Sequence, residues 1–324
     1  MLVHNPRPRR SGTNDYNNAN AQHASSGGFK EKALNFNEKY DEYLKEFNSI
    51  LNKFCENLNC RPEILNKSLR YSLELGGKRL RPVLAFAVGD LLGVKREELH
   101  NFALATELIH TYSLIHDDLP EMDNDDFRRG KPSNHIIFGT GNAVLAGDGL
   151  LNTAYSVLLR ECRKGAQYVA AAEFICDCAG VYGMIAGQSA DLLHENDTSF
   201  NEPTLNFIME NKTAKLITAP IVVPSILCGG KCFAELKAFG RDLGCLFQIT
   251  DDILDVEGDF DTLGKSIGKD KKEGKYSSVS IHGLDGSKLM ADVLAERCRG
   301  IIEGIGGDNG FLLSLIDSVR GRKH

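Results

Sequence analysis

The stretch EELHNFALATELIHTYSLIHDDLPEMD, residues 97–123, combines a long apolar helix pattern with an acidic end. Its apolar side chains recur every three or four residues, which predicts a helix over 97–118 with one face in the core. Asp117 and Asp118 follow directly on the apolar part. Carboxylates at the inner end of a core helix are unfavourable unless cations compensate them. For an isolated Asp-Asp pair, a solvated helix end is the competing interpretation.

The same helical periodicity continues through most of the chain. Glycine pairs such as Gly76-Gly77 and Gly229-Gly230 separate apolar segments, no stretch alternates convincingly with period two, and no βαβ rhythm is visible. Helices are predicted over residues 34–54, 61–75, 80–92, 97–118, 142–163, 167–192, 203–216, 218–229, 233–256, 287–303 and 309–320. The pattern predicts an all-α fold, a single large helical bundle with one continuous core.

Length and composition are those of an ordinary globular protein. The chain has 324 residues, of which 42% are hydrophobic and 25% charged, and its formal net charge is −6. Bulk nucleic-acid binding is therefore not expected, and an anionic substrate has to meet local basic clusters or metal. The longest apolar candidate, 216–227, is shorter than the roughly 18 residues of a membrane span and contains Pro220 and Pro224. We expect no membrane span.

The nine cysteines form no C-x-x-C pair, which favours reduced core thiols in an intracellular protein, and we expect a cytoplasmic one. Residues 1–28 are rich in Asn, Ser, Gly and Arg and poor in large apolar side chains. We therefore expect a disordered tail there and the folded domain over residues 29–324. Arg7, Arg9 and Arg10 leave an organelle presequence as an alternative, although no amphipathic periodicity supports it.

A second acidic cluster follows another apolar run. Asp251 and Asp255 are four residues apart, so on a helix they share one face and offer two oxygen ligands to a hard cation. In the first cluster, Asp117 and Asp123 are six residues apart, which an ideal helix does not align. Pro120 is therefore predicted to break the helix and bring Asp123 back. Two such clusters make a solvated helix end a poor explanation for both.

Basic residues accompany the acidic clusters. The run GGKRLRP at 76–82 puts three cations between helices, and RRGK at 128–131 puts three more just beyond the first acidic cluster. Arginine forks match phosphate oxygens, and glycine lets the backbone approach an anion. A diphosphate cannot sit against six aspartates unless divalent cations such as Mg²⁺ intervene, whereas a second anion could bind the basic loop directly. The two arrangements fit two diphosphate substrates.

The motifs in their order resemble a known family. GKRLRP at 77–82, DD-x4-D at 117–123 with RR at 128–129, KT at 212–213, and FQ at 247–248 before DD-x2-D at 251–255 resemble the trans-isoprenyl diphosphate synthases, most closely the bacterial-type farnesyl diphosphate synthases. The likeness covers roughly residues 32–324. It implies the isoprenoid synthase fold, a helical bundle around a central cavity, and a homodimer. It also implies Mg²⁺-dependent head-to-tail condensation of an allylic diphosphate (dimethylallyl, geranyl) with isopentenyl diphosphate, which gives farnesyl diphosphate.

The resemblance implies roles for individual residues. Three Mg²⁺ ions, with Mn²⁺ as a substitute, are expected on Asp117, Asp118, Asp123, Asp251, Asp252 and Asp255. Contacts to the allylic diphosphate are expected from Arg128, Lys212, Lys265 and Lys275. Isopentenyl diphosphate is expected on Gly77, Lys78, Arg81, His110 and Arg129, of which His110 has a purely structural alternative. The carbonyl near Lys212, the Thr213 hydroxyl and the Gln248 amide would steady the allylic carbocation. Gln188 and Asp191 would orient ligands or waters.

Product length is a finer expectation of the same resemblance. Ser113 and Tyr112, four and five residues before the first Asp-Asp, would line the floor of the chain pocket. The bulk of Tyr112 favours a fifteen-carbon product, although the ring would also suit an ordinary core position. A longer-chain, geranylgeranyl synthase is the nearest alternative, and a non-catalytic regulatory subunit is a second. A class I terpene cyclase is a third, but it would lack the basic isopentenyl pocket.

The C-terminal part departs from the family pattern in one place. After Gly274-Lys275 the chain reads Tyr276-Ser277-Ser278, where Ser or Thr followed by Thr is common. A backbone shift there would change how Lys275 reaches its phosphate. The basic end of the chain, 320–324, suits either closure over the site or a solvated tail.

Overall fold

The computed structural model describes residues 21–195, 197, 199–257 and 276–322, with side chains from residue 36 onward. The first half contains α1 (Ala21–Asn57), α2 (Glu63–Glu74), α3 (Leu80–Leu92), α4 (Arg96–Asp117), β1 (Phe127–Arg128), β2 (Lys131–Pro132), α5 (Asn134–Phe138) and α6 (Thr140–Glu161). The second half contains η1 (Cys162–Lys164), α7 (Ala166–Ala179), α8 (Met184–Leu193), α9 (Glu202–Ile208), η2 (Met209–Ala214), α10 (Lys215–Leu227), α11 (Phe233–Glu257), α14 (Ser278–Ile305) and α15 (Gly310–Arg320). The fold is all-α, as predicted.

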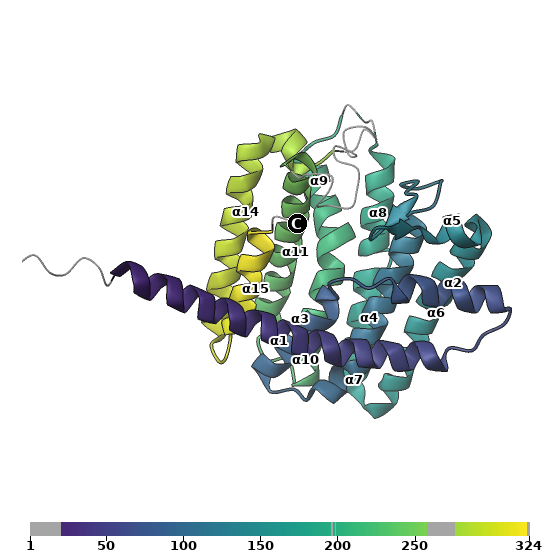
Figure 1. The fold of residues 1–324 in the computed structure, drawn as a ribbon, viewed down its shortest axis with the longest axis horizontal. Coiled ribbons are helices and arrows are strands. Elements are labelled where there is room, and N and C mark those ends of the chain that lie inside the picture. Colours follow the sequence, from purple (N-terminus) through teal and green to yellow (C-terminus); the bar gives the residue numbers. More distant parts are fainter. Residues whose placement is uncertain (1–20, 196, 198, 258–275, 323–324) are drawn as a thin grey trace, which may run out of the picture.

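The long helices form a bundle, and α1 runs across them on one side (Figure 1). Helix α4 packs against α6, α3 and α10, while α11 packs against α14, α10 and α15. Helix α10 lies among α3, α4, α7 and α11, and every side chain from Leu216 to Ser225 is buried. A helix that is apolar on all sides belongs in the core, which explains the apolar run that includes Pro220 and Pro224.

Three element boundaries differ from the prediction. The expected helix over 167–192 is broken at Gly180–Gly183, where the chain turns between α7 and α8. The glycines permit the turn, because a Cβ at Gly183 would lie 2.6 Å from the carbonyl oxygen of Asp177. The expected helices over 203–216 and 218–229 are divided instead by the π-helical turn η2. Helix α14 begins at Ser278, where Ser277 and Ser280 form a capping box, but its backbone is non-helical at Gly283, with a φ of 69°. The predicted helix over 287–303 lies in the part beyond this kink.

The short hairpin and helix α5 were not predicted. Strands β1 and β2 pair antiparallel, with Phe127 opposite Pro132. Each strand is only two residues long, too short for a period-two pattern to be visible. These are the only strands in the described part of the chain. The hairpin matters for function because it carries the basic run that follows the first acidic cluster.

The structure bears on two expectations, the position of the N-terminal boundary and the absence of a membrane span. Helix α1 begins at Ala21, so it includes residues assigned above to the tail, whereas residues 1–20 lie outside the described residues. The division into tail and domain stays a prediction.

The segment Ala166–Leu193 is long and apolar enough for a membrane span, with a mean hydropathy of 1.5 over its most apolar 18 residues. In this fold it is divided between α7 and α8, and α7 contributes buried side chains to the core.

Candidate active site

The first acidic cluster lies where α4 ends and the chain folds back. Asp118 caps α4, and the backbone then turns through Pro120. The Asp123 backbone N–H donates to the Asp117 carbonyl oxygen at 2.8 Å, and the Asp125 N–H donates to the Asp118 carbonyl at 3.1 Å. The predicted bend at Pro120 is therefore confirmed. It returns Asp123 to the side of Asp117, although the two residues are too far apart in sequence to align on one helix.

Asp117 is buried beside other carboxylates, an environment that is unfavourable for its ionised form. The pKa of its carboxyl is raised to about 6, chiefly by burial and in part by the negative charges of Asp123 and Asp118, while Lys212 and Arg128 oppose the increase. No ion pair joins Asp117 to a cation within the described residues. A buried carboxylate beside like charges is stabilised by a bound cation. This end of α4 therefore fits a metal ion better than a solvated helix end.

Asp118 has different neighbours from Asp117. It is buried, and the Arg128 guanidinium on β1 grips it, with Nε 3.0 Å from Oδ1 and Nη2 also on Oδ1. The turn after β1 consists of Arg129 and Gly130, whose φ angles are 54° and 73°. Two left-handed residues are typical of a type I′ hairpin turn, and the arginine is unusual there. The hairpin fixes Arg128 against Asp118 and directs Arg129 elsewhere.

The second acidic cluster lies near the C-terminal end of α11. Asp252 is buried and accepts hydrogen bonds from the Gln248 amide at 2.9 Å and from the Ser278 N–H at 2.7 Å. Gln248 in turn accepts from the Thr213 hydroxyl at 2.7 Å. One line of hydrogen bonds therefore joins η2, α11 and α14. Asp251 pairs instead with Arg322 near the C-terminus, at 2.9 Å, and partly exposed Asp255 lies one turn further on α11.

Lys212 and Thr213 project from the π-helical turn η2. The Lys212 ammonium pairs with Asp191 of α8 at 2.5 Å, which places Asp191 beside it as expected. Glycines on two helices let η2 pack backbone to backbone: a Cβ at Gly187 of α8 would lie 2.6 Å from Lys212 Cα, and one at Gly244 of α11 would overlap Ala214. A π-turn is common at functional sites because it redirects side chains. Here it points one residue at α8 and the next at α11.

The two acidic clusters meet at a small cavity of about 140 Å³. Its polar lining consists of Asp123, Asp191, Lys212, Thr213, Gln248 and Asp252. Leu205, Ile208, Met209 and Tyr276 complete it. The structure thus brings together residues of both Asp-rich motifs and the Lys-Thr pair. Two of the cations expected here, Lys265 and Lys275, lie outside the described residues.

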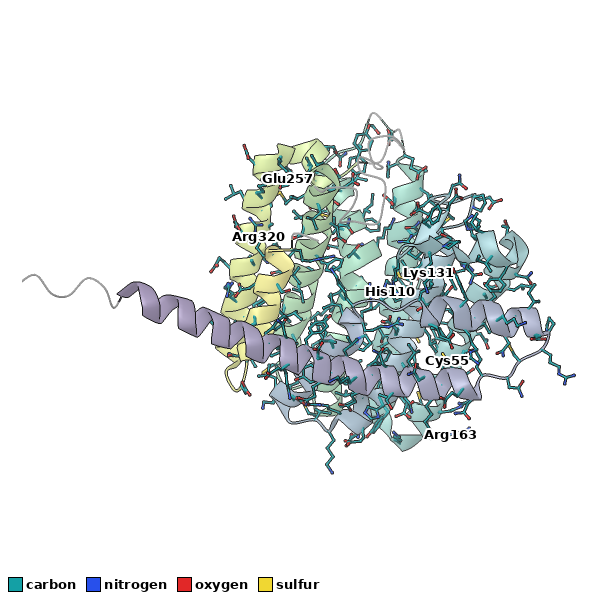
Figure 2. The ribbon with its side chains drawn as sticks, in the orientation of Figure 1. Cys55, His110, Lys131, Arg163, Glu257 and Arg320 are labelled. Carbon is teal, nitrogen blue, oxygen red and sulfur yellow. The ribbon has the colours of Figure 1, made fainter. Side chains whose placement is uncertain are left out.

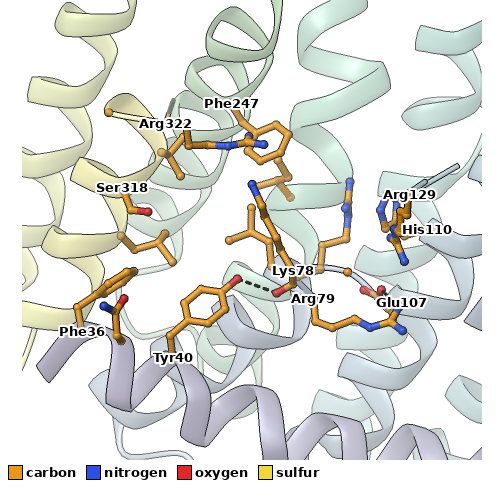
Figure 3. Close-up of a pocket in the computed structure, with 18 of the residues that line it drawn as sticks. Phe36, Tyr40, Lys78, Arg79, Glu107, His110, Arg129, Phe247, Ser318 and Arg322 are labelled. Carbon is orange, nitrogen blue, oxygen red and sulfur yellow. Dashed lines mark hydrogen bonds and ion pairs between the residues drawn. The ribbon is translucent and has the colours of Figure 1, made fainter. Parts of the chain in front are cut away.

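A second cavity, of about 770 Å³, is lined by the basic loop. All five residues expected to hold isopentenyl diphosphate line it, namely Gly77, Lys78, Arg81, His110 and Arg129. Figure 3 shows Arg129 beside His110 on one side, with Phe247 and Arg322 on the other. In the whole molecule, His110 lies among the central helices, whereas Arg163 is at the edge (Figure 2).

Charge in this cavity is strongly positive. Burial lowers the pKa of Arg81 to about 10, and burial with Arg81 and Arg129 nearby lowers the pKa of His110 well below its usual value. The Arg81 Nε is buried and has no hydrogen-bond partner in the described part of the chain. Cations that repel one another and an unsatisfied N–H are both stabilised by a phosphate oxygen. The cavity is therefore suited to an anion without metal.

Arg79 does not line this site as a free cation, although it lies in the same basic run. It is buried with a left-handed φ of 48°, and its guanidinium pairs with Glu107 of α4 at 2.7 Å and donates to the Leu73 carbonyl at 2.5 Å. The Tyr40 hydroxyl of α1 donates to the Lys78 carbonyl at 2.7 Å. Neither Glu107 nor Tyr40 was singled out for this site from the sequence. A charged residue inside an apolar run is a signal that could have indicated Glu107, whereas Tyr40 has no such signal.

The residues expected to set product length lie on α4, about one turn before the first acidic cluster. Tyr112 is buried and meets His116 edge to face at 5.7 Å, while the Ser113 hydroxyl donates to the His110 carbonyl at 3.0 Å. Neither residue belongs to the described lining of the two cavities. Their role in chain length stays a prediction. The Gln188 amide, expected to orient ligands, is buried without a hydrogen-bond partner in the described part of the chain.

Comparison with known proteins agrees with this geometry. The chain is 38% identical to a farnesyl diphosphate synthase of Bacillus subtilis over 285 residues, 86% of this chain and 96% of that protein. It is 39% identical to a chloroplastic geranylgeranyl pyrophosphate synthase of Capsicum annuum, over 89% of this chain and 76% of that protein. A geranyltransferase structure from Helicobacter pylori, complexed with magnesium and isoprenyl diphosphate, superposes with a TM-score of 0.75 at 32% identity, over 87% of this chain and 95% of that one. Residues 62–300 match the polyprenyl synthetase family model, and the chain belongs to the polyprenyl synthetase family.

Proposed function

We propose that the protein joins an allylic diphosphate to isopentenyl diphosphate in the presence of Mg²⁺, giving farnesyl diphosphate and free diphosphate. One observation supports this above all. Two anion sites of opposite design occur in one bundle: one lined by carboxylates, and one lined by arginine, lysine and histidine. A diphosphate needs divalent metal at the first and none at the second. Dimethylallyl and then geranyl diphosphate would occupy the first site, and isopentenyl diphosphate the second.

The carboxylates fit Mg²⁺ by their chemistry, since all are hard oxygen donors. In the described residues no three Asp, Glu, His or Cys side chains come close enough to form a metal centre by themselves. Mg²⁺ usually keeps waters and shares phosphate oxygens rather than occupying an all-protein cage. All six aspartates of the two clusters are proposed as Mg²⁺ ligands; Asp118, Asp251 and Asp252 also accept hydrogen bonds from the protein in this structure. The bound metal would stabilise the negative charge of the leaving diphosphate.

The protein groups then divide the reaction between them. Heterolysis of the allylic C–O bond leaves a carbocation and a diphosphate, and Lys212 and Arg128 would stabilise the charge that develops on the diphosphate. The Thr213 hydroxyl and the Gln248 amide, already joined to each other at 2.7 Å, would direct their oxygens at the cation together with the carbonyl near Lys212. The double bond of isopentenyl diphosphate forms the new C–C bond, and the released diphosphate takes the proton.

The fifteen-carbon product is proposed over a longer one. The similar proteins are named as both farnesyl and geranylgeranyl synthases, so likeness alone does not choose between them. The support for the shorter product is the bulk of Tyr112 on α4, a buried ring that would stop a product chain growing along this helix. The intact lysine of η2 argues against a regulatory subunit, and the basic cavity argues against a cyclase.

A homodimer in the cytoplasm completes the proposal. Large apolar side chains are exposed on the consecutive elements α5 to α8, which suits a subunit interface: Ile136, Ile137, Val144, Leu145, Leu159, Val169, Ile185 and Leu193. The nine unpaired cysteines suit a reducing compartment. Light scattering of the purified protein should give twice the chain mass of 35.6 kDa. A monomer with full activity would remove this part of the proposal.

The deciding experiment is a product analysis. The purified protein is incubated with isopentenyl diphosphate, dimethylallyl or geranyl diphosphate and Mg²⁺, and the products are separated by chain length. An EDTA sample and an Arg81→Ala variant serve as controls. Metal-dependent farnesyl diphosphate is expected, and the variant should mainly raise the KM for isopentenyl diphosphate. A twenty-carbon product would keep the reaction but reject the chain-length assignment. No condensation by folded, Mg²⁺-loaded protein would reject the proposed function.

A further inference from the structure

The loop between α8 and α9 is held in one shape by Asp197. Its carboxylate accepts hydrogen bonds from the Ser199 N–H at 2.8 Å and the Ser199 hydroxyl at 2.7 Å, and it meets His194 at 2.7 Å. These bonds lower the pKa of Asp197 to about 2, His194 being the main cause. Asn201 then caps α9. The residue fixed between these two anchors is Phe200.

Phe200 contacts an aromatic residue from a distant part of the chain. Its ring stacks on Tyr276, with centroids 4.4 Å apart and planes 8° from parallel. Phe200 packs against the hydrophobic core, and His194 meets its edge at 6.0 Å. The Tyr276 backbone leads directly into the Ser277 capping box and the bond from Ser278 to Asp252. Tyr276 is therefore fixed at its ring by one loop and at its backbone by α11 and α14.

This fixed ring lies on the wall of the small cavity where the two acidic clusters meet. Lys212, Thr213 and Gln248 line the same cavity. The polar part of that wall consists of charged and hydrogen-bonding groups, which attract water. Leu205, Ile208 and Met209 supply aliphatic surface, and Tyr276 is the one aromatic ring among the described lining residues. The ring therefore presents its apolar face to an otherwise polar part of the wall.

We propose that Tyr276, held in place by Phe200, is a further functional residue that keeps water from the allylic carbocation. The inference rests on the function proposed above and deepens it. Shielding of reactive intermediates from hydrolysis is a general need of closed active sites. In the described part of the chain, Tyr276 is half-buried, does not belong to the hydrophobic core and stacks on Phe200.

The chemistry gives a direct readout of shielding. Heterolysis of the allylic C–O bond produces the same carbocation and diphosphate whatever follows. Attack by the double bond of isopentenyl diphosphate forms a C–C bond and releases a proton, giving the longer diphosphate. Attack by water forms a C–O bond and releases a proton, giving an allylic alcohol. The ratio of alcohol to condensation product therefore reports access of water, independently of the rate of ionisation.

The test measures this ratio with geranyl diphosphate, isopentenyl diphosphate and Mg²⁺. Tyr276→Ala and Phe200→Ala should each raise the ratio of alcohol to farnesyl diphosphate by about ten-fold or more, since water reaches the cation. Tyr276→Phe keeps the ring and should leave the ratio at the wild-type value. Tyr182→Ala is the matched control, because Tyr182 is a highly exposed tyrosine outside this cavity. Circular dichroism and thermal melting check that each variant is folded.

The outcomes distinguish failure of the shielding role of Tyr276 from failure of the proposed function. If Tyr276→Ala is folded and active with the wild-type ratio, the inference is wrong while the proposed function stands. If folded Tyr276→Ala forms neither alcohol nor condensation product, the ring serves binding or ionisation and the shielding assignment is again wrong. If Phe200→Ala does not fold, the comparison of Tyr276→Ala with Tyr276→Phe is sufficient. Absence of condensation by the wild-type enzyme would instead reject the proposed function itself.

Discussion

Replacing Gly187 with alanine should damage the active site through the backbone. An added Cβ on α8 would overlap the Lys212 backbone nitrogen and would lie 2.6 Å from Lys212 Cα and 2.7 Å from the Asn211 carbonyl carbon. Ordinary van der Waals contact begins near 3.4 Å, so η2 must move away by at least about 0.8 Å, the amount that Lys212 Cα requires. All three atoms belong to the main chain, so no flexible side chain can move aside. The strain has to separate η2 from α8.

That separation acts directly on the reacting groups. Asp191 lies one turn beyond Gly187 on α8 and holds the Lys212 ammonium at 2.5 Å. Thr213 on the same π-turn donates to Gln248 of α11. A displacement of about 1 Å at a catalytic group costs on the order of 100-fold in rate, so we expect kcat to fall by about that factor. Overpacking should lower the free energy of unfolding by about 1–3 kcal/mol.

The assay separates a site effect from a general loss of stability. Steady-state kinetics give kcat and the KM of each substrate, and urea unfolding gives the stability. The KM for isopentenyl diphosphate should hold, because Gly187 lies outside the lining of the basic cavity. Gly300→Ala on α14 is the matched control, since a Cβ there meets nothing within 4 Å. A folded Gly187→Ala enzyme with wild-type kcat and stability would refute the reasoning.

Three further predictions concern α4. Glu107→Ala leaves the buried Arg79 guanidinium unpaired and should destabilise the fold by about 3–5 kcal/mol in urea unfolding, so an unchanged midpoint would contradict it. The pKa of Asp117 is raised from 3.8 to about 6, chiefly by burial. In the metal-free protein, its contribution to the free energy of unfolding should therefore be fully present below pH 3.8 and be lost as the pH rises through 6. Mg²⁺ affinity, measured by calorimetry, should rise over the same range, and a flat profile would argue against Asp117 as a ligand. Tyr112→Ala should shift the product from fifteen toward twenty carbons in chromatography, and an unchanged product would show that the ring is only a core aromatic.

Much of the helical architecture could be predicted from periodicity and glycine alone. Helices α3 and α4 were predicted within about a residue at each end, because their apolar spacing is regular and glycines or charged residues flank them. The break at Gly180–Gly183 was missed because both neighbouring helices are apolar, so the period continues across the turn. The π-turn η2 could not be read locally. Its close packing against Gly187 and Gly244 involves residues far away in sequence.

The site shows the same division between local and tertiary information. The sequence motifs identified which residues would meet, and the structure brings the basic set to one cavity. Sequence could not show that Arg79 is paired with Glu107, since both Arg79 and Arg81 are cations in the same run. Nor could it show that Tyr276 stacks on Phe200, because that contact depends on how two loops meet. Residue type is local information, whereas the direction of a side chain is set by the packing around it.

The paired aspartates illustrate why direction matters more than number. Consecutive residues on a helix point about 100° apart, so the two carboxylates of an Asp-Asp pair cannot serve one ion from the same side. In each pair the second member turns toward the protein: Asp118 binds Arg128, and Asp252 binds Gln248 and Ser278. Asp251, the first member of the second pair, accepts from Arg322, whereas Asp117 has no ion pair in the described residues. We infer that Asp118 and Asp252 position the cation or amide that acts beside the metal. Each aspartate of such a pair would bind metal, and the second would also hold the protein groups beside it. These two roles explain why both acids occur at the end of an apolar helix, where burying either carboxylate is unfavourable.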